Sequence, residues 1–346
     1  MCIFLRFKKL EDKLRVTNFQ KSIVNVRKLI TFNNRTMEKP NFFLVGAPKC
    51  GTTAMSNYLN QHPDIHMGPK EMHFFGADLR TDRAKNQTRE KYLSRLNEEN
   101  NLETKYLGEA SVWYLYSQTA ASEIKTFAPE AKILIMLRNP VEMLYSLYYQ
   151  WLHEGKSLPP FQEAIEQESE LRQKAEPLFA EGKRWREVMH TDLAKFYEQV
   201  DKYFNVFGQE NVKVIIYDDF KKNISQVYQE ILEFLEIDSS IVPQQFERIN
   251  SHKRYKNYLF HRLFSNPHET PELERKISSN LRNIIKLLMP KKLRKQVRDR
   301  LINWNTVTSK RPAMAPEVHQ YICKKLAPDI EKLSSLLNRD LTHWCQ

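Results

Sequence analysis

The sequence predicts an α/β fold in which a central parallel sheet is flanked by helices in a three-layer sandwich. Three apolar runs indicate its strands, at residues 42–45, 132–137 and 212–217, and turn-forming residues bound these runs. Continuous apolar runs of this length are typical of strands that are buried on both faces, as in parallel sheets. Helical patterns lie between the runs, and this alternation of strand and helix predicts a doubly wound sheet.

Length and composition indicate one large domain preceded by a short extension. The chain has 346 residues, of which 41% are hydrophobic, and this content supports a sizeable core. Residues 1–37 place apolar side chains at helical intervals among many basic residues, and Pro40 precedes the first strand. We therefore predict an N-terminal helical extension at 1–37 and a single domain at 38–346. The extension would be able to pair copies of the chain, so the oligomeric state stays open.

The sequence shows neither a transmembrane segment nor a secretion signal. No run reaches the roughly 18 apolar residues that a transmembrane helix needs, and residues 1–7 are too short for the apolar part of a signal peptide. The four cysteines are scattered, without metal-ligand spacing or the density of a disulfide-rich secreted domain. A cytoplasmic location in a reducing compartment fits these features best.

The formal net charge of +12 indicates an anionic partner, because excess positive potential concentrates anions near a protein surface. Nucleic acid, an anionic membrane, an acidic glycan and a nucleotide all satisfy this condition. Seven basic residues gather between positions 286 and 300, among apolar residues at helical spacing. This stretch is either the solvated face of a surface helix or a docking strip for a polyanion or a membrane surface.

A glycine-bracketed loop follows the first predicted strand. Residues 45–53 read V-G-A-P-K-C-G-T-T, and a strand, a Gly-rich loop and a helix in this order direct backbone N–H groups and the positive helix end at one small volume. In a Walker A loop the lysine comes directly after the second glycine. Here Thr52 holds that position and Lys49 lies inside the loop. The chain therefore has a P-loop-like anion cradle without the kinase lysine.

A second anion site is predicted where the strand at 132–137 ends. Arg138 follows this strand directly. Asn139 and Pro140 suit the N-cap and the first position of a helix, which then carries Ser146. An arginine at the carboxyl edge of a parallel sheet is able to present its guanidinium to a phosphate in the crevice where such sheets bind ligands. Two anion sites suit a nucleotide with charged groups at both its 5′ and 3′ ends.

Six short motifs are spread along residues 40–344. They read G-A-P-K-C-G-T-T at 46–53, H-P-D-I at 62–65, K-E-M-H-F-F at 70–75, G-E-A-S at 108–111, L-R-N-P-V-E-M-L-Y-S at 137–146 and L-N-R-D-L-T-H-W at 337–344. In type and order they resemble the PAPS-dependent sulfotransferases, in particular the bacterial and heparan-sulfate-type carbohydrate sulfotransferases. PAPS, 3′-phosphoadenylyl sulfate, is the sulfuryl donor of that family.

The resemblance implies a cofactor site and gives its residues roles. Lys49 would stabilise the negative charge that grows on the oxygen between sulfur and the leaving phosphate. Cys50 lies within the cradle, where a small residue suffices. The alternative is a redox switch, because a helix N-terminus is able to lower the pKa of a thiol. No metal ion is implied, because the transferred group carries one charge and no carboxylate cluster suggests an ion site. The residues would be Lys49, Cys50, Gly51, Thr52 and Thr53 for the 5′-phosphosulfate, Arg138 and Ser146 for the 3′-phosphate, and Lys253 and Arg254 in a loop that closes over the 3′-phosphate.

Glu71 and His73 are the two candidates for the general base. Glu71 occupies the position where the glycan-modifying relatives carry their base, and a carboxylate near the acceptor is able to take a proton from a hydroxyl or an amine. His73 would point to the same face if the segment formed a strand, and the small-molecule sulfotransferases use a histidine. The alternatives are an ion pair of Glu71 with Lys70 on the surface and a packing role for His73.

Other positions near the motifs bear on the acceptor. Val112 stands where the family often has a proline, and Met143 stands where it often has an arginine. Trp113 and Tyr114 would either flank the acceptor or the adenine, or pack in the core. These positions leave the cofactor assignment intact and weaken any inference about the acceptor.

The resemblance implies an enzyme that moves a sulfuryl group from PAPS to a hydroxyl or amine of a carbohydrate-containing acceptor and releases 3′,5′-ADP. A small-molecule or lipid acceptor is the alternative within the family, and peripheral contact with a membrane stays open. An ATP-dependent phosphotransferase would need a lysine at position 52 and a strand-end aspartate for Mg²⁺. A nucleic-acid-binding protein would explain the charge but not the ordered pair of anion sites, and no stacking or finger motif favours it.

Overall fold

The structure is a computed structural model. It describes residues 38–79, 87–98, 104–153, 158–170, 191–243 and 311–345, with short pieces that include 253–255 and 306–308. From Pro40 onward these residues belong to one unit of the chain. The helical extension predicted at 1–37 and most of the basic stretch at 286–300 lie outside the described residues.

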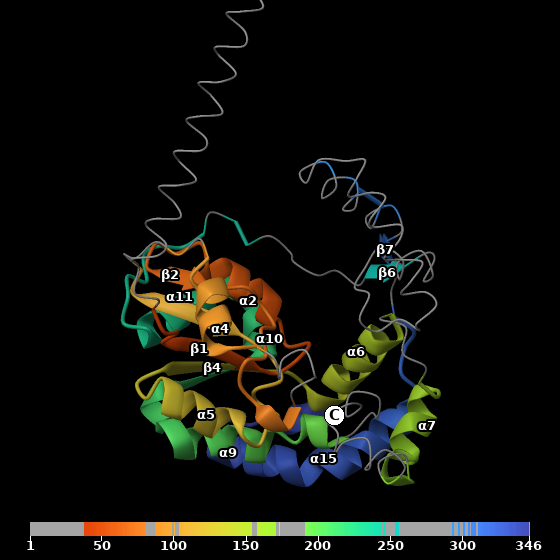
Figure 1. Cartoon of the computed structure of the whole chain (residues 1–346). Coiled ribbons are helices and arrows are strands. Elements are labelled where there is room, and N and C mark those ends of the chain that lie inside the picture. Colours follow the sequence, from red (N-terminus) through yellow and green to blue (C-terminus); the bar gives the residue numbers. More distant parts are fainter. Residues whose placement is uncertain are drawn as a thin grey trace, which may run out of the picture. The chain divides into compact units, whose positions relative to one another are not determined.

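A five-stranded parallel sheet lies at the centre of the described unit (Figure 1). Its strand order is β2-β3-β1-β4-β5, and each neighbouring pair is parallel. Every residue of β1 and β3 is buried, which is typical of parallel strands covered on both faces. The strands are β1 (Phe42–Gly46), β2 (Ile65–Met67), β3 (Tyr106–Ala110), β4 (Lys132–Leu137) and β5 (Val212–Ile216).

The order of the strands reverses next to β1. The chain places β2 and β3 on one side of β1 and then crosses to β4 and β5 on the other side. Leu44 in β1 aligns with Ala110 of β3 and with Leu134 of β4, so the carboxyl ends of the three strands meet at one edge. Ligands of open α/β sheets bind at this kind of switch point, outside the carboxyl ends of the strands.

Helices cover both faces of the sheet (Figure 1), and the predicted fold class is confirmed. On one face α2 (Thr52–Leu59) contacts α11 (Ile224–Phe234), and on the other α9 (Phe196–Phe207) contacts α5 (Ala120–Phe127) and α15 (Pro316–Leu336). The described residues also form α4 (Arg89–Leu96), α6 (Pro140–His153), α7 (Phe161–Glu166) and α10 (Tyr217–Lys222), with short 3₁₀ turns η1 (Ala77–Leu79), η3 (Thr191–Ala194), η4 (Gln209–Asn211) and η6 (Thr342–Cys345). A separate antiparallel pair joins β6 (Lys253–Tyr255) and β7 (Thr306–Thr308).

The bounds of β4 and β5 show how well the apolar runs predict where strands end. β4 has the predicted bounds, whereas β5 ends at Ile216 because Tyr217 begins α10. Asp218 and Asp219 stand in the first turn of α10, where acidic side chains complement the positive end of the helix. The charge pattern therefore favours a helix start at a position that the apolar run alone assigns to the strand.

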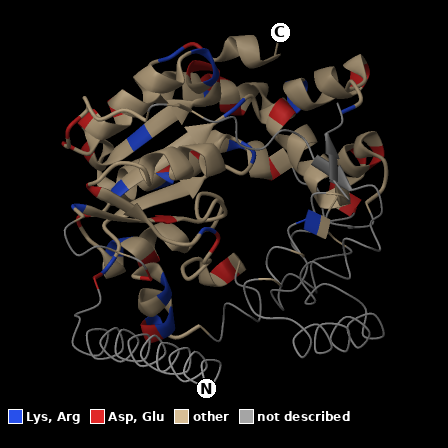
Figure 2. Ribbon diagram, turned by 90° about the horizontal axis from the view of Figure 1, so that it is seen from above, with Lys and Arg blue, Asp and Glu red and all other residues tan. Residues whose placement is uncertain are grey.

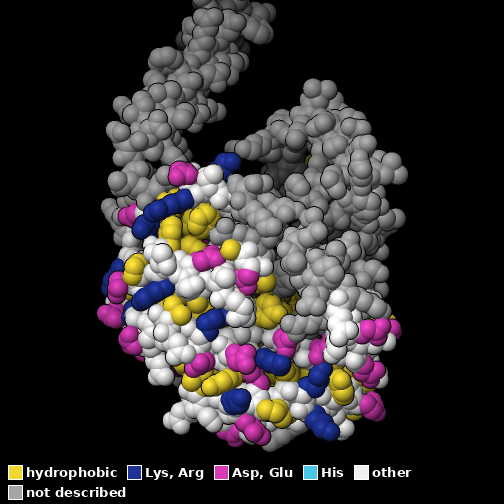
Figure 3. All heavy atoms as spheres, turned by 60° about the horizontal axis from the view of Figure 1, so that its bottom comes forward, with side chains coloured by type: hydrophobic (Ala, Val, Ile, Leu, Met, Phe, Trp, Pro, Cys, Tyr) yellow, Lys and Arg dark blue, Asp and Glu magenta, His cyan; other side chains and the backbone are white. Residues whose placement is uncertain are grey.

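Charged side chains lie mainly on the helices and connecting segments (Figure 2). Those in the central sheet are Glu109, Lys132 and Lys213. On the face brought forward in Figure 3, basic and acidic side chains alternate with small apolar areas. The described part of that face therefore does not concentrate the positive net charge of the chain.

Candidate functional site

The loop between β1 and α2 makes a tight turn at the switch point. Lys49 and Gly51 have φ of 65° and 85°, in the left-handed region. A Cβ on Gly46 would lie only 2.6 Å from the Cβ of Leu115, so the end of β1 needs a glycine. The backbone N–H of Ala47 donates to the carbonyl of Met136 in β4 at 2.7 Å. The loop is thus held against the strand whose end carries Arg138.

The N-terminus of α2 opens onto this turn. Gly51 is the N-cap residue, and it has no side chain to accept a hydrogen bond from the first N–H groups of the helix. Thr52 is buried, and Thr53 is partly exposed. Uncapped N–H groups at the positive end of a helix, beside a lysine and two hydroxyls, form a set of donors that suits anionic oxygens.

The Cys50 thiol is buried rather than presented to the cradle. Its Sγ lies 3.3 Å from the carbonyl oxygen of Pro48, and the residue has no exposed surface. Burial raises the pKa of the thiol to about 12, although Arg138 and Lys49 act to lower it. The expectation of a lowered thiol pKa is wrong, because desolvation outweighs the neighbouring positive charges. Only the backbone of Cys50 is therefore available to bind an anion in the cradle.

Lys70 links the cradle to the candidate base. Its ammonium donates to the Thr53 hydroxyl at 2.8 Å and lies 3.8 Å from Glu71 Oε1. Burial lowers the pKa of Lys70, while the Glu71 carboxylate acts to raise it. Lys70 begins the K-E-M-H-F-F motif, but its role cannot be predicted from that position, because an adjacent Lys-Glu pair is common on protein surfaces. Its contact with Thr53 makes it a site residue that only the fold identifies.

Glu71 and His73 face each other, but the expected strand geometry is wrong. His73 Nε2 lies 3.3 Å from Glu71 Oε2, which also accepts from the Val112 backbone N–H at 3.3 Å. Residues 70–75 form no strand, and Glu71 and His73 have left-handed φ of 57° and 50°. A turn, not the alternation of a strand, therefore brings the two candidate bases together.

The aromatic pair after β3 belongs to the core. Trp113 and Tyr114 are 8% and 2% exposed. Trp113 stacks on Trp151, with ring centroids 6.4 Å apart, and the Tyr114 hydroxyl donates to the buried Glu109 carboxylate at 2.7 Å. Of the two roles left open by the sequence, the structure supports core packing.

Arg138 lies at the end of β4 with its guanidinium partly buried. Its Nε donates to Glu142 Oε2 at 2.9 Å, and its Cζ lies 4.9 Å from the centre of the Tyr217 ring. Asn139 caps α6 as predicted, because its Oδ1 accepts from two backbone N–H groups of the first turn. Ser146 is buried near the end of the second turn of α6. Arg138 and Ser146 thus flank the start of one helix.

Arg311 is a further basic residue at this end of the sheet. Burial and the positive charge of Arg138 lower the pKa of Arg311, while Glu142 and Tyr145 act to raise it. The Tyr145 hydroxyl donates to the carbonyl of Pro312 at 3.1 Å, which ties the following residue to α6. Arg311 lies outside the six motifs, and its position in a basic doublet is the only signal in the sequence.

Lys253 and Arg254 lie in β6, opposite Thr308 and Val307 of β7. The structure describes only the backbone pairing of these residues, and their side chains lie outside what it describes. Their predicted role at the 3′-phosphate stays a prediction.

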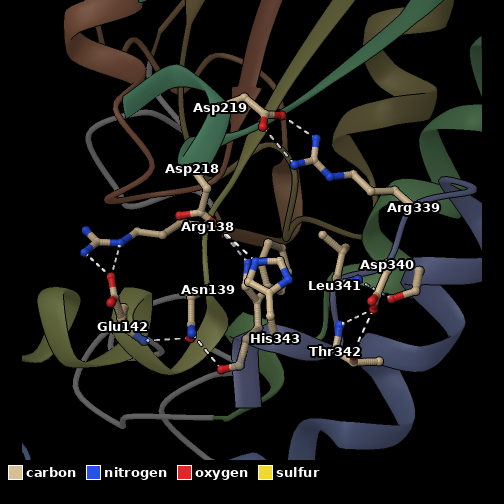
Figure 4. A network of polar contacts seen from close by, with 12 residues as sticks. Arg138, Asn139, Glu142, Asp218, Asp219, Arg339, Asp340, Leu341, Thr342 and His343 are labelled. Carbon is tan, nitrogen blue, oxygen red and sulfur yellow. Dashed lines mark hydrogen bonds and ion pairs between the residues drawn. The ribbon is translucent and has the colours of Figure 1, made fainter. Parts of the chain in front are cut away.

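The C-terminal segment joins the residues that follow β4 to the first turn of α10 (Figure 4). Asn139 Nδ2 donates to the Trp344 carbonyl at 2.6 Å, and Trp344 Nε1 donates to Asp218 Oδ2 at 3.0 Å. Arg339 forms a two-pronged ion pair with Asp219, which lowers the pKa of that carboxyl group. Three separate parts of the sequence are therefore cross-linked beside Arg138.

Two features are absent from the described part of the chain. Its helices include none with the length and apolar character needed to cross a membrane. Its His, Cys, Asp and Glu side chains form no group of three or more that would hold a metal ion.

Known proteins resemble this chain over most of its length. The family model described as "Sulfotransferase domain" matches residues 39–304. Membrane-associated sulfotransferase kil1 of Dictyostelium discoideum is 26% identical, over 58% of this chain and 56% of that protein. Human carbohydrate sulfotransferase 15 and human heparan sulfate glucosamine 3-O-sulfotransferase 6 are each 30% identical, over 38% and 35% of this chain. The chain spans about half of the first relative, and 31% and 33% of the two human proteins.

A solved structure has the same fold. The crystal structure of a sulfotransferase from Alicyclobacillus acidocaldarius superposes with a TM-score of 0.61 and 28% sequence identity, over 89% of this chain and 100% of that one. The family match covers well over half of the chain and includes the cradle, the segment at 70–75 and Arg138. The chain belongs to the sulfotransferase domain family.

Proposed function

We propose that the protein transfers a sulfuryl group from PAPS to a hydroxyl or amine of a carbohydrate-containing acceptor and releases 3′,5′-ADP. The observation that carries the proposal is the pairing of an anion cradle, with Lys49 inside the loop, and a second cationic site at Arg138, on neighbouring strands β1 and β4. The sulfotransferase family supplies the reaction class. The names of the carbohydrate and heparan sulfate relatives favour a glycan acceptor.

The described residues fit the two charged ends of PAPS. Lys49, Thr52, Thr53 and the uncapped N–H groups of α2 would hold the 5′-phosphosulfate. Arg138 and Ser146, with Arg311 near Arg138, would hold the 3′-phosphate. These donors are cations, hydroxyls and backbone N–H groups, which are the groups that bind phosphate and sulfate oxygens in proteins.

PAPS would supply the transferable sulfuryl group, and the chain's own side chains would supply the acid–base and electrostatic catalysis. Glu71 would take the proton from the acceptor hydroxyl or amine, with His73 in contact with Oε2 of the same carboxylate. Lys49 and Lys70 would stabilise negative charge that develops on the far side of the transferred group. We assign the base to Glu71 rather than His73 because its carboxylate contacts both Lys70 and His73.

The alternatives to the proposed reaction and acceptor are not equally well supported. An ATP-dependent phosphotransferase needs a strand-end aspartate for Mg²⁺, and here Asp218 and Asp219 are bonded to Trp344 and Arg339. A small-molecule or lipid acceptor stays open, as do the oligomeric state and contact with a membrane surface. The cytoplasmic location stays a prediction; the three described cysteines are free thiols.

The first test measures cofactor binding. Calorimetry of 3′,5′-ADP without metal is compared with ATP plus Mg²⁺, and Arg138→Ala is the matched variant. We expect tight binding of 3′,5′-ADP that the variant weakens. A preference for ATP, or no nucleotide binding by folded protein, would reject the proposed cofactor.

The second test measures the reaction itself. Transfer of radiolabel from [³⁵S]PAPS is followed with N-desulfated heparan sulfate and with chondroitin as acceptors. We expect that one of them is labelled and that Lys49→Ala abolishes labelling while the circular dichroism of the variant stays that of the folded protein. Transfer at the wild-type rate by folded Lys49→Ala would remove Lys49 from the mechanism.

A further inference from the structure

The segment that carries Glu71 and His73 is anchored by two buried hydroxyls. The backbone N–H of His73 donates to Ser111 Oγ at 3.2 Å, and the next two N–H groups donate to the Tyr114 hydroxyl at 2.8 and 3.2 Å. Both hydroxyls donate in turn to one oxygen of Glu109, each at 2.7 Å. Three consecutive backbone groups of the segment are thus connected to a single carboxylate in β3.

Glu109 gives the protons of these hydroxyls an acceptor. A backbone N–H always donates, so Ser111 and Tyr114 accept from the segment while each directs its own single proton to another acceptor. Glu109 provides that acceptor and also accepts from the Tyr92 hydroxyl at 2.6 Å. Its side chain is fully buried. Burial raises the pKa of Glu109, and the three hydroxyls favour its ionised form.

The anchored backbone has a conformation that it would not adopt alone. Glu71 and His73 are not glycines, yet both have left-handed φ, a conformation that L-residues with a side chain keep only where the surroundings determine it. The hydrogen bonds to Ser111 and Tyr114 begin at His73 and run to the end of the motif. The network therefore acts on the turn that presents the Glu71 carboxylate.

We propose that Glu109 is a positioning residue, which acts through the hydroxyls of Ser111 and Tyr114 to hold the 70–75 turn with Glu71 directed at the acceptor. The inference rests on the proposed function, because it gives the turn a purpose in sulfuryl transfer. It adds a role for the G-E-A-S motif that neither cofactor binding nor the general base accounts for.

Two tyrosine variants isolate this role. Tyr92→Phe and Tyr114→Phe each remove one hydroxyl that donates to Glu109. Of the two tyrosine hydroxyls, that of Tyr114 also accepts from the backbone of the 70–75 segment, and that of Tyr92 does not. The ring of Tyr92 stacks on Phe74 at 4.1 Å and is retained in Tyr92→Phe, so packing against the segment is preserved. Comparison of the two variants therefore separates the loss of one hydrogen bond to Glu109 from the loss of the hydroxyl that binds the backbone of the segment.

Hydrogen exchange of the ligand-free protein provides the first readout. We expect the backbone amides of Phe74 and Phe75 to exchange at least about tenfold faster in Tyr114→Phe and at the wild-type rate in Tyr92→Phe. If Tyr114→Phe does not fold, Ser111→Ala replaces it, with the His73 amide as its readout. Equal exchange in the variant and the wild type overturns the inference, whatever the activity of the protein.

Steady-state kinetics of sulfuryl transfer provide the second readout. We expect Tyr114→Phe to lower kcat about 10- to 100-fold, as misplacement of a reacting group does, with the affinity for 3′,5′-ADP unchanged. Tyr92→Phe should retain kcat. Equal kcat in the two variants overturns the inference, since positioning would then not matter to the reaction. A wild-type protein with no transfer rejects the proposed function, while faster exchange in Tyr114→Phe than in Tyr92→Phe would still support the hydroxyl anchor through which Glu109 acts on the turn.

Discussion

Lys70 and Cys50 show how burial changes the chemistry of single side chains near the cradle. Both residues lie close to the start of α2, and desolvation is the largest effect on the pKa of each. For the lysine, burial favours the neutral form and the contacts with Thr53 and Glu71 hold it in place. For the cysteine, burial favours the thiol over the thiolate, which is the nucleophilic form. Desolvation thus favours the uncharged form of both side chains. Lys70 is part of the site through its contact with Thr53, whereas the Cys50 thiol is not.

We expect Lys70→Met to separate catalysis from cofactor binding. Methionine keeps the length of the side chain but removes the charge beside Thr53, so sulfuryl transfer should fall about 10²-fold, as for other lost transition-state donors. Binding of 3′,5′-ADP, which has no sulfuryl group, should change little in calorimetry. The control is Arg138→Ala, which should weaken 3′,5′-ADP binding. Equal weakening by Lys70→Met would place Lys70 at the phosphate instead.

We expect Cys50 to resist alkylation in the native protein at neutral pH. Its pKa of about 12 and its full burial leave almost no accessible thiolate. Peptide mass spectrometry after iodoacetamide treatment should find Cys345, which is partly exposed, modified before Cys50. Protein unfolded in urea is the control, in which both should react. Rapid modification of native Cys50 would restore the redox switch that its sequence position suggests.

At the scale of secondary-structure elements, α15 and α9 meet through a buried carboxylate. Asp329 on α15 accepts from the backbone N–H of Tyr197, in the first turn of α9, at 3.3 Å. The pKa of Asp329 is raised to about 6, chiefly by burial, with Glu198 adding to the effect and Lys195 opposing it. The junction between the two helices therefore includes a group that titrates in mildly acidic solution.

The raised pKa of Asp329 predicts how stability changes with pH. Between the ordinary value of 3.8 and about 6, folded Asp329 binds more protons than the unfolded chain does. The contribution of Asp329 to the free energy of unfolding is therefore largest at low pH and is lost as the pH rises through this window. Asp329→Asn keeps an acceptor for Tyr197 but does not ionise. Its melting temperature relative to the wild type should rise from pH 4 to pH 7, and a constant difference would contradict the raised pKa.

Local sequence patterns predict the elements of the site better than they predict its turns. The apolar runs locate β1, β4 and most of β5, and the glycine spacing locates the cradle, because these features depend on neighbouring residues in the chain. The turn at 70–75 depends on Ser111 and Tyr114, some forty residues away. The contact of Lys70 with Thr53 also requires the fold. The sequence therefore identifies Glu71 and His73 as candidates but not the turn that brings them together.

At the scale of the whole molecule, the site is assembled from parts that lie far apart in the chain. The cradle, the 70–75 turn and Arg138 lie within the first half of the sequence. Trp344 and Arg339, from beyond residue 330, bind the residues after β4 and the first turn of α10. The family match ends at residue 304. The last of the six motifs nevertheless includes both of these residues, because the structure needs their contacts to hold the strand ends together.

We expect Trp344→Ala to weaken both stability and nucleotide binding. The indole is 1% exposed, and its loss should lower the free energy of unfolding by about 3–5 kcal/mol, as for other buried tryptophans. Loss of the indole bond to Asp218 should also loosen this turn, whose backbone carbonyl at residue 344 accepts from Asn139 next to Arg138. Urea unfolding and 3′,5′-ADP calorimetry measure the two effects. His343→Ala, on the same turn but about half exposed, is the control and should change both little.

The left-handed residues of the site have a consequence for attempts to make this protein more robust. Lys49, Glu71 and His73 each keep a backbone conformation that glycine adopts freely, at a cost to folding of about 1–3 kcal/mol for such a residue. Replacement by glycine would relieve that cost and remove a side chain that the proposed site uses. A laboratory selection for heat resistance alone would therefore favour inactive proteins, and screens of this enzyme should select for turnover and thermal tolerance together.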